Sequence, residues 1–200
     1  MNRGERARSD ILDAAERLIA ERGIQVPLRD IAVAAGQRNN SAVNYHFRNR
    51  QDLIDAVVRR RLEPMERGRA QMVEALDEDA RDDVSAWLRI MVLPLTTVGS
   101  SYYARFLQAA SLHLRTDVDQ SQGSVWPQVL DRLAHAIIPA RDREARRRRV
   151  KAIATTMFAL LAERERAAQA GDDVGSSEEI IAMLAAVLTA PIPTDKSLVP

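Results

Sequence analysis

Two short helical patterns meet at a glycine in the stretch from residue 28 to residue 50, LRDIAVAAGQRNNSAVNYHFRNR, and few folds accommodate such a pair. Leu28, Ile31 and Ala35 recur at helical spacing and give the first pattern one apolar stripe. Gly36 follows at the place where a helix commonly ends in a left-handed residue. The stretch therefore predicts a first short helix that ends at Gly36.

A second short helix is predicted over residues 41–46. Asn39 or Asn40 can cap its first turn, because an asparagine side chain accepts a hydrogen bond from a free backbone amide. In and just after this helix, only Val43 and Phe47 are clearly suited to burial. The two helices and the turn between them predict a helix-turn-helix.

The second helix has side chains that suit a close approach to DNA. Ser41 and Ala42 are small, so the backbone can lie near a duplex while amides and hydroxyls bond to base edges and phosphates. The sequences AAG at 34–36, NYHF at 44–47 and RQDL at 50–53 together resemble the DNA-binding signature of the TetR (tetracycline repressor) family of transcriptional regulators. The resemblance spans roughly the first 60 residues.

The chain departs from the usual pattern of that family in two places. The step from Gly36 to Phe47 is one residue longer than is usual, so the register of the base contacts is open by one position. Pro27 stands where a serine or threonine cap is common, but proline also suits the first turn of a helix because its missing amide would be unpaired there.

The resemblance also implies which residues contact DNA. Tyr45 and His46 match positions that contact phosphate in the family, although both could simply fill the interior of a small domain. Arg50 begins the next helix, where its guanidinium and the free amides could hold one phosphate. The candidate DNA-contacting residues are Arg38, Asn39, Asn40, Ser41, Asn44, Tyr45, His46 and Arg50.

The charge distribution agrees with this interpretation. The whole chain has a net charge of only +1, but residues 1–61 hold 12 arginines against 8 acidic residues, which leaves the rest mildly acidic. A basic N-terminal third is what attraction to phosphate requires, although surface arginines are usually only solvated. Arg3, Arg6 and Arg8 could contact phosphate or belong to a frayed, solvated end.

The sequence carries little that indicates catalysis. It has no cysteine, which excludes disulfides and thiolate metal sites, and only three histidines. No nucleophile with a base, metal cluster or glycine-rich phosphate loop is visible, so we expect neither an enzyme nor a metal or cofactor. No apolar run is long enough to cross a membrane and no secretory signal is visible, so a DNA-binding protein of this kind is expected in the cytoplasm.

The rest of the chain predicts an all-α protein of about nine helices. An N-terminal three-helix DNA-binding domain is expected over 1–50, a helical effector-binding and dimerisation domain over 51–190, and a flexible tail over 191–200. The first helix is expected from about residue 6 to residue 22. Asn49 and Ser176 are expected to cap later helices. Pro64 predicts a kink in a long helix, with or without a regulatory role.

Most aromatic and soft side chains lie beyond residue 80. In TetR-like proteins the middle helices enclose an effector pocket, and aromatic walls with a few polar tips suit one. An ordinary core would use the same residues at the same spacing. A histidine such as His113 is more often a core or surface residue than a ligand contact. The candidate pocket residues are Trp87, Met91, Tyr102, Tyr103, Phe106, His113, Trp126 and Phe158.

The resemblance implies a homodimer in which the last two helices pair with their copies in a second subunit. Two reading helices about 34 Å apart would then bind a near-palindromic operator in double-stranded DNA. The candidate interface residues are Val150, Ile153, Met157, Leu161, Ile180, Leu184, Val187 and Leu188. Four arginines at 146–149 form either a solvated face or a second nucleic-acid patch.

These features together predict a sequence-specific transcriptional regulator. We expect a repressor that a small-molecule effector of unknown identity releases from DNA. A dimeric DNA-binding protein without ligand control is the nearest alternative. A helical-bundle enzyme whose reaction leaves no motif is a distant one.

Overall fold

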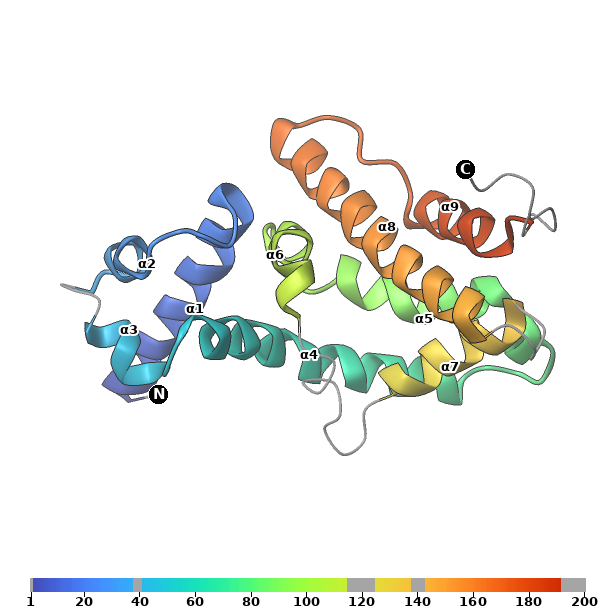
Figure 1. The fold of residues 1–200 in the computed structure, drawn as a ribbon, viewed down its shortest axis with the longest axis horizontal. Helices are drawn as coiled ribbons and strands as arrows, with labels where there is room; N and C mark the ends of the chain where they lie inside the picture. Colours follow the sequence, from blue (N-terminus) through green and yellow to red (C-terminus); the bar gives the residue numbers. More distant parts are fainter. Residues whose placement is uncertain (1, 38–40, 115–124, 138–142, 192–200) are drawn as a thin grey trace.

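The computed structural model describes residues 2–37, 41–114, 125–137 and 143–191, and within these ranges the chain is all-helical, as predicted (Figure 1). Two 3-10 turns, at Asp79–Asp82 and Ser111–His113, accompany the α-helices. The α-helices are α1 (Arg3–Arg22), α2 (Leu28–Ala34), α3 (Ser41–His46), α4 (Arg50–Glu74), α5 (Val84–Thr96), α6 (Tyr103–Ala110), α7 (Trp126–Ile137), α8 (Arg143–Ala170) and α9 (Ser177–Thr189).

The first three helices form a group at one end of the molecule, which we call the head (Figure 1). Helix α1 begins three residues earlier than the sequence indicated, because Asn2 and Glu5 form a capping box. The Asn2 side chain accepts from the Glu5 amide and the Glu5 carboxylate accepts from the Asn2 amide, both at 2.8 Å. Arg3 and Arg6 therefore lie in an ordered helix rather than in a frayed end.

The turn of the predicted helix-turn-helix is present. Gly36 has a φ of +69°, a conformation that glycine adopts without strain, and it ends the first of the two short helices. Helix α3 then covers the six residues that the sequence predicted, Ser41–His46. The core of the head gathers inward-facing residues from its three helices and the start of α4. These include Ile11, Leu12, Ile19, Ile31, Val43, Phe47, Leu53 and Val57.

Helix α4 runs from the head into the rest of the molecule (Figure 1). The predicted cap is present: the Asn49 side chain accepts from the Asp52 amide at 2.9 Å. Pro64 lies inside the helix on its exposed side, and the helix continues to Glu74. One helix thus belongs to both halves of the molecule.

The remaining helices form the body. Helix α9 packs against α5 and α8, and α7 packs against α5 and α8. Helix α6 lies between the head and the body, where it contacts α1 on one side and α8 on the other (Figure 1). The core here contains Trp87, Leu88, Met91 and Phe106, each at most 2% exposed. In the described ranges no helix is long and apolar enough to span a membrane.

A buried carboxylate ties the head to the body. Glu16 of α1 is only 3% exposed, and it accepts from Arg60 of α4 at 3.1 Å and from Arg61 of α4 at 3.0 and 3.1 Å. The Ser100 hydroxyl, in the loop before α6, donates to the same carboxylate. We call Glu16, Arg60, Arg61 and Ser100 the junction cluster.

The N-terminus of α6 is held by a second carboxylate, Glu165 of α8. Its two oxygens accept from the backbone amides of Ala104 at 2.8 Å and Arg105 at 3.0 Å. Burial raises the pKa of the Glu165 carboxyl above its usual value, and this outweighs the opposing effect of these two hydrogen bonds. Helix α6 is therefore fixed by acidic side chains at the junction with the head and within the body.

Candidate nucleic-acid interface and ligand pocket

Helix α3 is held by two apolar anchors and leaves its polar side chains in solvent. Val43 is 1% exposed and Phe47, just after the helix, is 2% exposed. Ser41 and Asn44 are exposed, and Tyr45 is 85% exposed. An exposed tyrosine next to exposed amide and hydroxyl side chains matches the chemistry that contacts phosphates and base edges. The outward face of α3 is therefore the candidate nucleic-acid interface.

Three aromatic rings contact one another along the end of α3. The Tyr45 and His46 rings meet edge to face with centroids 5.0 Å apart, and the His46 ring leans on Phe47 at 6.2 Å. The guanidinium of Arg8 in α1 lies over the Phe47 ring, 5.2 Å from its centroid. His46 is half-buried, whereas Tyr45 beside it is exposed.

Three of the predicted contact residues, Arg38, Asn39 and Asn40, lie outside the described residues. The capping of α3 and the register of its base contacts therefore stay predictions.

The structure gives Arg50 a different role from the phosphate contact that the sequence suggested. Its Nη1 donates to the carbonyl oxygens of Ile24 and Val26, both at 2.7 Å, and so holds the loop between α1 and α2. The start of α4 is also occupied by an acid, because the Asp52 carboxylate accepts from the Arg48 amide at 3.1 Å. That hydrogen bond lowers the pKa of Asp52, and a carboxylate at this helix end would repel a phosphate.

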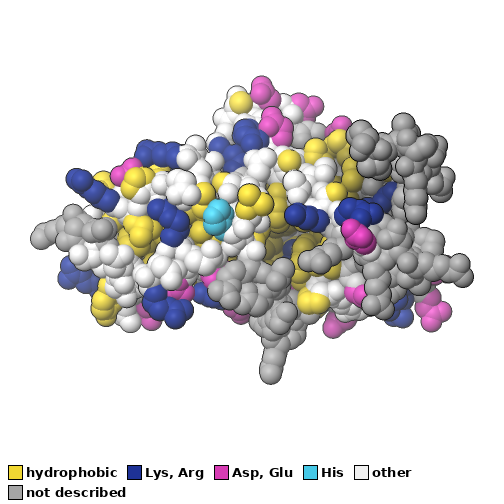
Figure 2. All heavy atoms as spheres, in the orientation of Figure 1, with side chains coloured by type: hydrophobic (Ala, Val, Ile, Leu, Met, Phe, Trp, Pro, Cys, Tyr) yellow, Lys and Arg dark blue, Asp and Glu magenta, His cyan; other side chains and the backbone are white. Residues whose placement is uncertain are grey.

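Two exposed side chains of the head were absent from the predicted set. Val33 of α2 is 62% exposed, and the side chain of Arg48 is 88% exposed although it lies 3.5 Å from Asp52. Arginine side chains are spread over the head end of the face in Figure 2. Arg48 could have been predicted as a contact residue, because it directly follows the aromatic residues 45–47. Nothing in the sequence distinguishes Val33 from a core residue.

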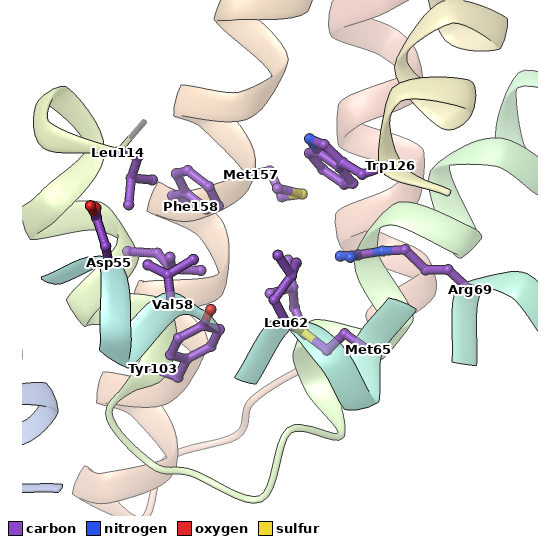
Figure 3. A pocket seen from close by; sticks show the side chains of 12 residues that line it. Asp55, Val58, Leu62, Met65, Arg69, Tyr103, Leu114, Trp126, Met157 and Phe158 are labelled. Carbon is purple, nitrogen blue, oxygen red and sulfur yellow. The ribbon is translucent and has the colours of Figure 1, made fainter. Parts of the chain in front are cut away.

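The body contains a cavity that runs along one face of α4. Asp55, Val58, Leu62, Met65 and Arg69 line it at helical spacing from this one helix. The space that water-sized atoms can occupy is about 90 Å³, enough for several waters or a slender molecule. Figure 3 shows Trp126, Met157 and Phe158 on the opposite side. The other lining residues are Leu95, Tyr103, Leu107 and Leu114.

The predicted pocket residues divide into three groups. Tyr103, Trp126 and Phe158 line the cavity. Trp87, Met91 and Phe106 are at most 2% exposed and belong to the core, and they are not among the residues that line this cavity. His113 is exposed and Tyr102 lies in the groove beside the junction cluster, under the Arg105 guanidinium, so neither lines the cavity. Core and pocket use the same residue types, so the sequence could not separate them.

Most of the predicted dimer-interface residues face the interior of one copy. Six of the eight are at most 5% exposed, because α9 packs on α5 and α8, and α8 also packs on α6 and α7: Ile153, Met157, Leu161, Ile180, Leu184 and Leu188. These side chains offer almost no surface to a second subunit. Val150 is half-buried, and Val187 is 37% exposed beside Met183, which is 40% exposed.

The arginine run at 146–149 has partners within the chain where its side chains are described. Arg148 pairs with Glu144 at 3.0 Å. Arg149 donates to the carbonyl oxygens of Leu188 and Ala190 at the end of α9, where a cation stabilises a helix. These contacts favour a structural role over a second nucleic-acid patch.

Comparisons with known proteins agree with the geometry of the head. Residues 11–57 match the family model of bacterial regulatory proteins of the tetR family. Among solved structures, the chain is similar to a protein from Mesorhizobium loti that has been proposed to be a TetR-family transcriptional regulator. The two share 17% sequence identity over 95% of this chain and 96% of that chain, with a TM-score of 0.46. A search of curated proteins finds no significant match.

Proposed function

We propose that this chain, whose residues 11–57 match the family model of bacterial regulatory proteins of the tetR family, is a transcriptional repressor that binds a near-palindromic operator as a homodimer. A small molecule in the α4 cavity releases it from DNA. The single observation that carries the DNA-binding part is the face of α3, where Ser41, Asn44 and Tyr45 lie in solvent while Val43 and Phe47 fix the helix to the head.

The dimer is proposed because one six-residue helix reaches too few base pairs for specific binding. A two-fold copy would bring a second α3 about one turn of DNA away, roughly 34 Å. Met183 and Val187 are the exposed large apolar residues of α9, so we place the contact on that outward face rather than on the buried residues of α8 and α9.

Release is proposed to pass along α4 and through the junction cluster. Helix α4 lines the cavity with one face and enters the head at its N-terminal end. Arg60 and Arg61 of the same helix bind Glu16 of α1. A ligand that moves α4 therefore moves a helix to which the head is bonded, and it lowers DNA affinity if it binds the displaced state more tightly.

Selection of bound duplexes from a random DNA pool tests the DNA-binding proposal. We expect enrichment of a two-fold sequence with half-sites about one helical turn apart. Recovery of no two-fold sequence from a folded preparation would contradict the proposal.

A matched pair of variants in α3 then separates two kinds of contact. Tyr45→Ala should weaken binding to all DNA sequences by about tenfold, because phosphate contacts carry no sequence information. Asn44→Ala should instead cost about 1–3 kcal/mol on the selected operator and little on random DNA. Both side chains are exposed, so the free energy of unfolding should change by no more than about 0.5 kcal/mol. Mobility shifts and thermal unfolding measure these effects.

A DNA-binding dimer without ligand control is the second candidate, and the small size of the cavity favours it. About 90 Å³ of free space suits a slender ligand or a few waters. A packing defect in an ordinary hydrophobic core would leave a cavity of similar size. A ligand screen by thermal shift, repeated in the mobility-shift assay, separates the two candidates. Only a controlled regulator has a ligand that both stabilises the protein and releases the operator.

A further inference from the structure

One buried carboxylate in the α4 cavity has no cationic partner among the residues that the structure describes. Asp55 is 8% exposed, and it accepts a hydrogen bond from Gln51 Nε2 at 2.8 Å. The same Gln51 nitrogen lies 2.8 Å from the His113 carbonyl oxygen. Among the described residues, no Lys, Arg or His forms an ion pair with Asp55. An ionised carboxylate in such a place raises the free energy of the empty protein until a cation pairs with it.

The charge at the other end of the cavity is already balanced. The Arg69 guanidinium, 2% exposed as a residue, pairs with Glu66 on the next turn of α4 and lies over the Trp126 ring, 4.7 Å from its centroid. The second Glu66 oxygen accepts from the backbone amides of Val125 and Trp126. Arg69, Glu66 and Asp55 together leave one negative charge, located at Asp55.

We propose that the cavity binds an organic cation: a slender, mostly apolar molecule with one protonated amine that pairs with Asp55. An anionic ligand would meet an unpaired carboxylate at one end and would have to displace Glu66 from Arg69 at the other. A neutral ligand would leave the charge of Asp55 unbalanced. The inference deepens the proposed function and rests on it, because it names the ligand class of the same cavity.

The walls of the cavity match the rest of such a molecule. Asp55 and Arg69 are 14 positions apart on α4, which corresponds to about 21 Å of helix. Figure 3 shows Leu62 and Met65 along this length, with Asp55 at one end beside Leu114 and Arg69 at the other beside Trp126. An aromatic or alkyl body can therefore lie along α4 while its amine reaches the Asp55 end.

Three probes with one apolar body and different head groups test the proposal: 4-phenylbutylamine, 4-phenylbutanol and 4-phenylbutanoate. Isothermal titration calorimetry on the full chain should show the amine binding at least tenfold more tightly than either of the others. This ranking needs no variant, so it holds whether or not a substituted protein folds. An amine that fails to bind, or that binds no more tightly than the alcohol, overturns the proposal.

Two variants then assign the effect to one carboxylate. Asp55→Asn keeps the shape and an oxygen for Gln51, and it should weaken amine binding at least tenfold while leaving the alcohol unchanged. Glu63→Gln is the matched control, because it removes the same charge from an exposed position on α4 that pairs only with Arg67 among the described residues. Unchanged amine affinity in a folded Asp55→Asn protein would also overturn the proposal.

The test of the cation site can fail independently of the test of the proposed DNA-binding function. Operator selection and mobility shifts are carried out without any probe, so they test the regulator alone. Amine binding by a chain that selects no operator would overturn the regulator and keep the cation site. Operator binding with a preference for the carboxylate probe would keep the regulator and overturn the cation site.

Discussion

The face of α3 and the cavity along α4 are both proposed to bind a partner, but they are built in opposite ways. On α3 the polar side chains lie in solvent, and only Val43 and Phe47 are buried. In the cavity ten of the twelve lining residues belong to the hydrophobic core or pack against it, Met157 and Tyr103 among them. Binding and folding are therefore carried by different residues on α3, whereas in the body they are carried by the same ones. Variants that affect one property without the other should be common in α3 and rare along the cavity.

The largest expected effect is the loss of the α3 anchor. Phe47→Ala removes a ring that is 2% exposed, so it should lower the free energy of unfolding by about 3–5 kcal/mol and abolish operator binding. Chemical denaturation and mobility shifts measure both. Phe106→Ala in the body is the matched control, since that ring is fully buried as well. It should cost similar stability, yet the fraction that stays folded should bind DNA normally.

Equal loss of DNA affinity per folded molecule in Phe47→Ala and Phe106→Ala would contradict this contrast between α3 and the body. It would mean that the position of α3 depends on packing in the body as much as on its own anchor.

The second effect concerns the junction cluster, which joins the two regions. Glu16→Gln removes the carboxylate that binds Arg60 and Arg61 and should lower the free energy of unfolding by about 2 kcal/mol. This figure is below that of a fully buried pair, because both arginine side chains are more than 20% exposed. Glu21→Gln is the control, since Glu21 pairs with Arg17 on the surface at 3.8 Å.

The same variant indicates how the two regions communicate. If the junction cluster links them, calorimetry of Glu16→Gln should resolve two unfolding steps where the unchanged chain gives one. A single step with unchanged stability would remove the cluster from the route proposed between cavity and head.

The head could be predicted from the sequence because its signals are local. Gly36 ends a helix, and Asn49 accepts a hydrogen bond from the amide three residues later, as its position in the sequence indicates. The role of Arg50 was missed because its partners, Ile24 and Val26, are more than 20 residues away along the chain. A guanidinium that binds carbonyl groups has no local signature.

The body could be predicted only as a set of helices. Trp87 and Trp126 are both apolar aromatic residues near the start of a helix, yet one is in the core and the other lines the cavity. Whether such a residue lies in the core or lines the cavity depends on how α4, α5 and α7 cross. The same holds for α8 and α9: the spacing of Ile153, Met157 and Leu161 identified a buried face, but not that the chain's own helices cover it.

The smallest expected effect is a pH dependence that originates in the body. Burial raises the pKa of the Glu165 carboxyl in the folded chain above its usual value of 4.5, so the folded state binds its proton more readily than the unfolded state. The stabilisation from this proton is complete below the unfolded pKa and is lost as the pH rises through the folded pKa. The contribution of Glu165 to the free energy of unfolding is therefore expected to fall as the pH rises from the unfolded pKa to the folded pKa.

Glu165→Gln isolates the effect, because glutamine cannot titrate. The difference in unfolding free energy between the unchanged chain and Glu165→Gln should be most favourable to the unchanged chain below pH 4.5 and should shrink above it. Glu163→Gln, an exposed neighbour that pairs with Arg166 at 2.8 Å, should show no such trend. A difference that grows with rising pH would mean that the Ala104 and Arg105 amides outweigh burial.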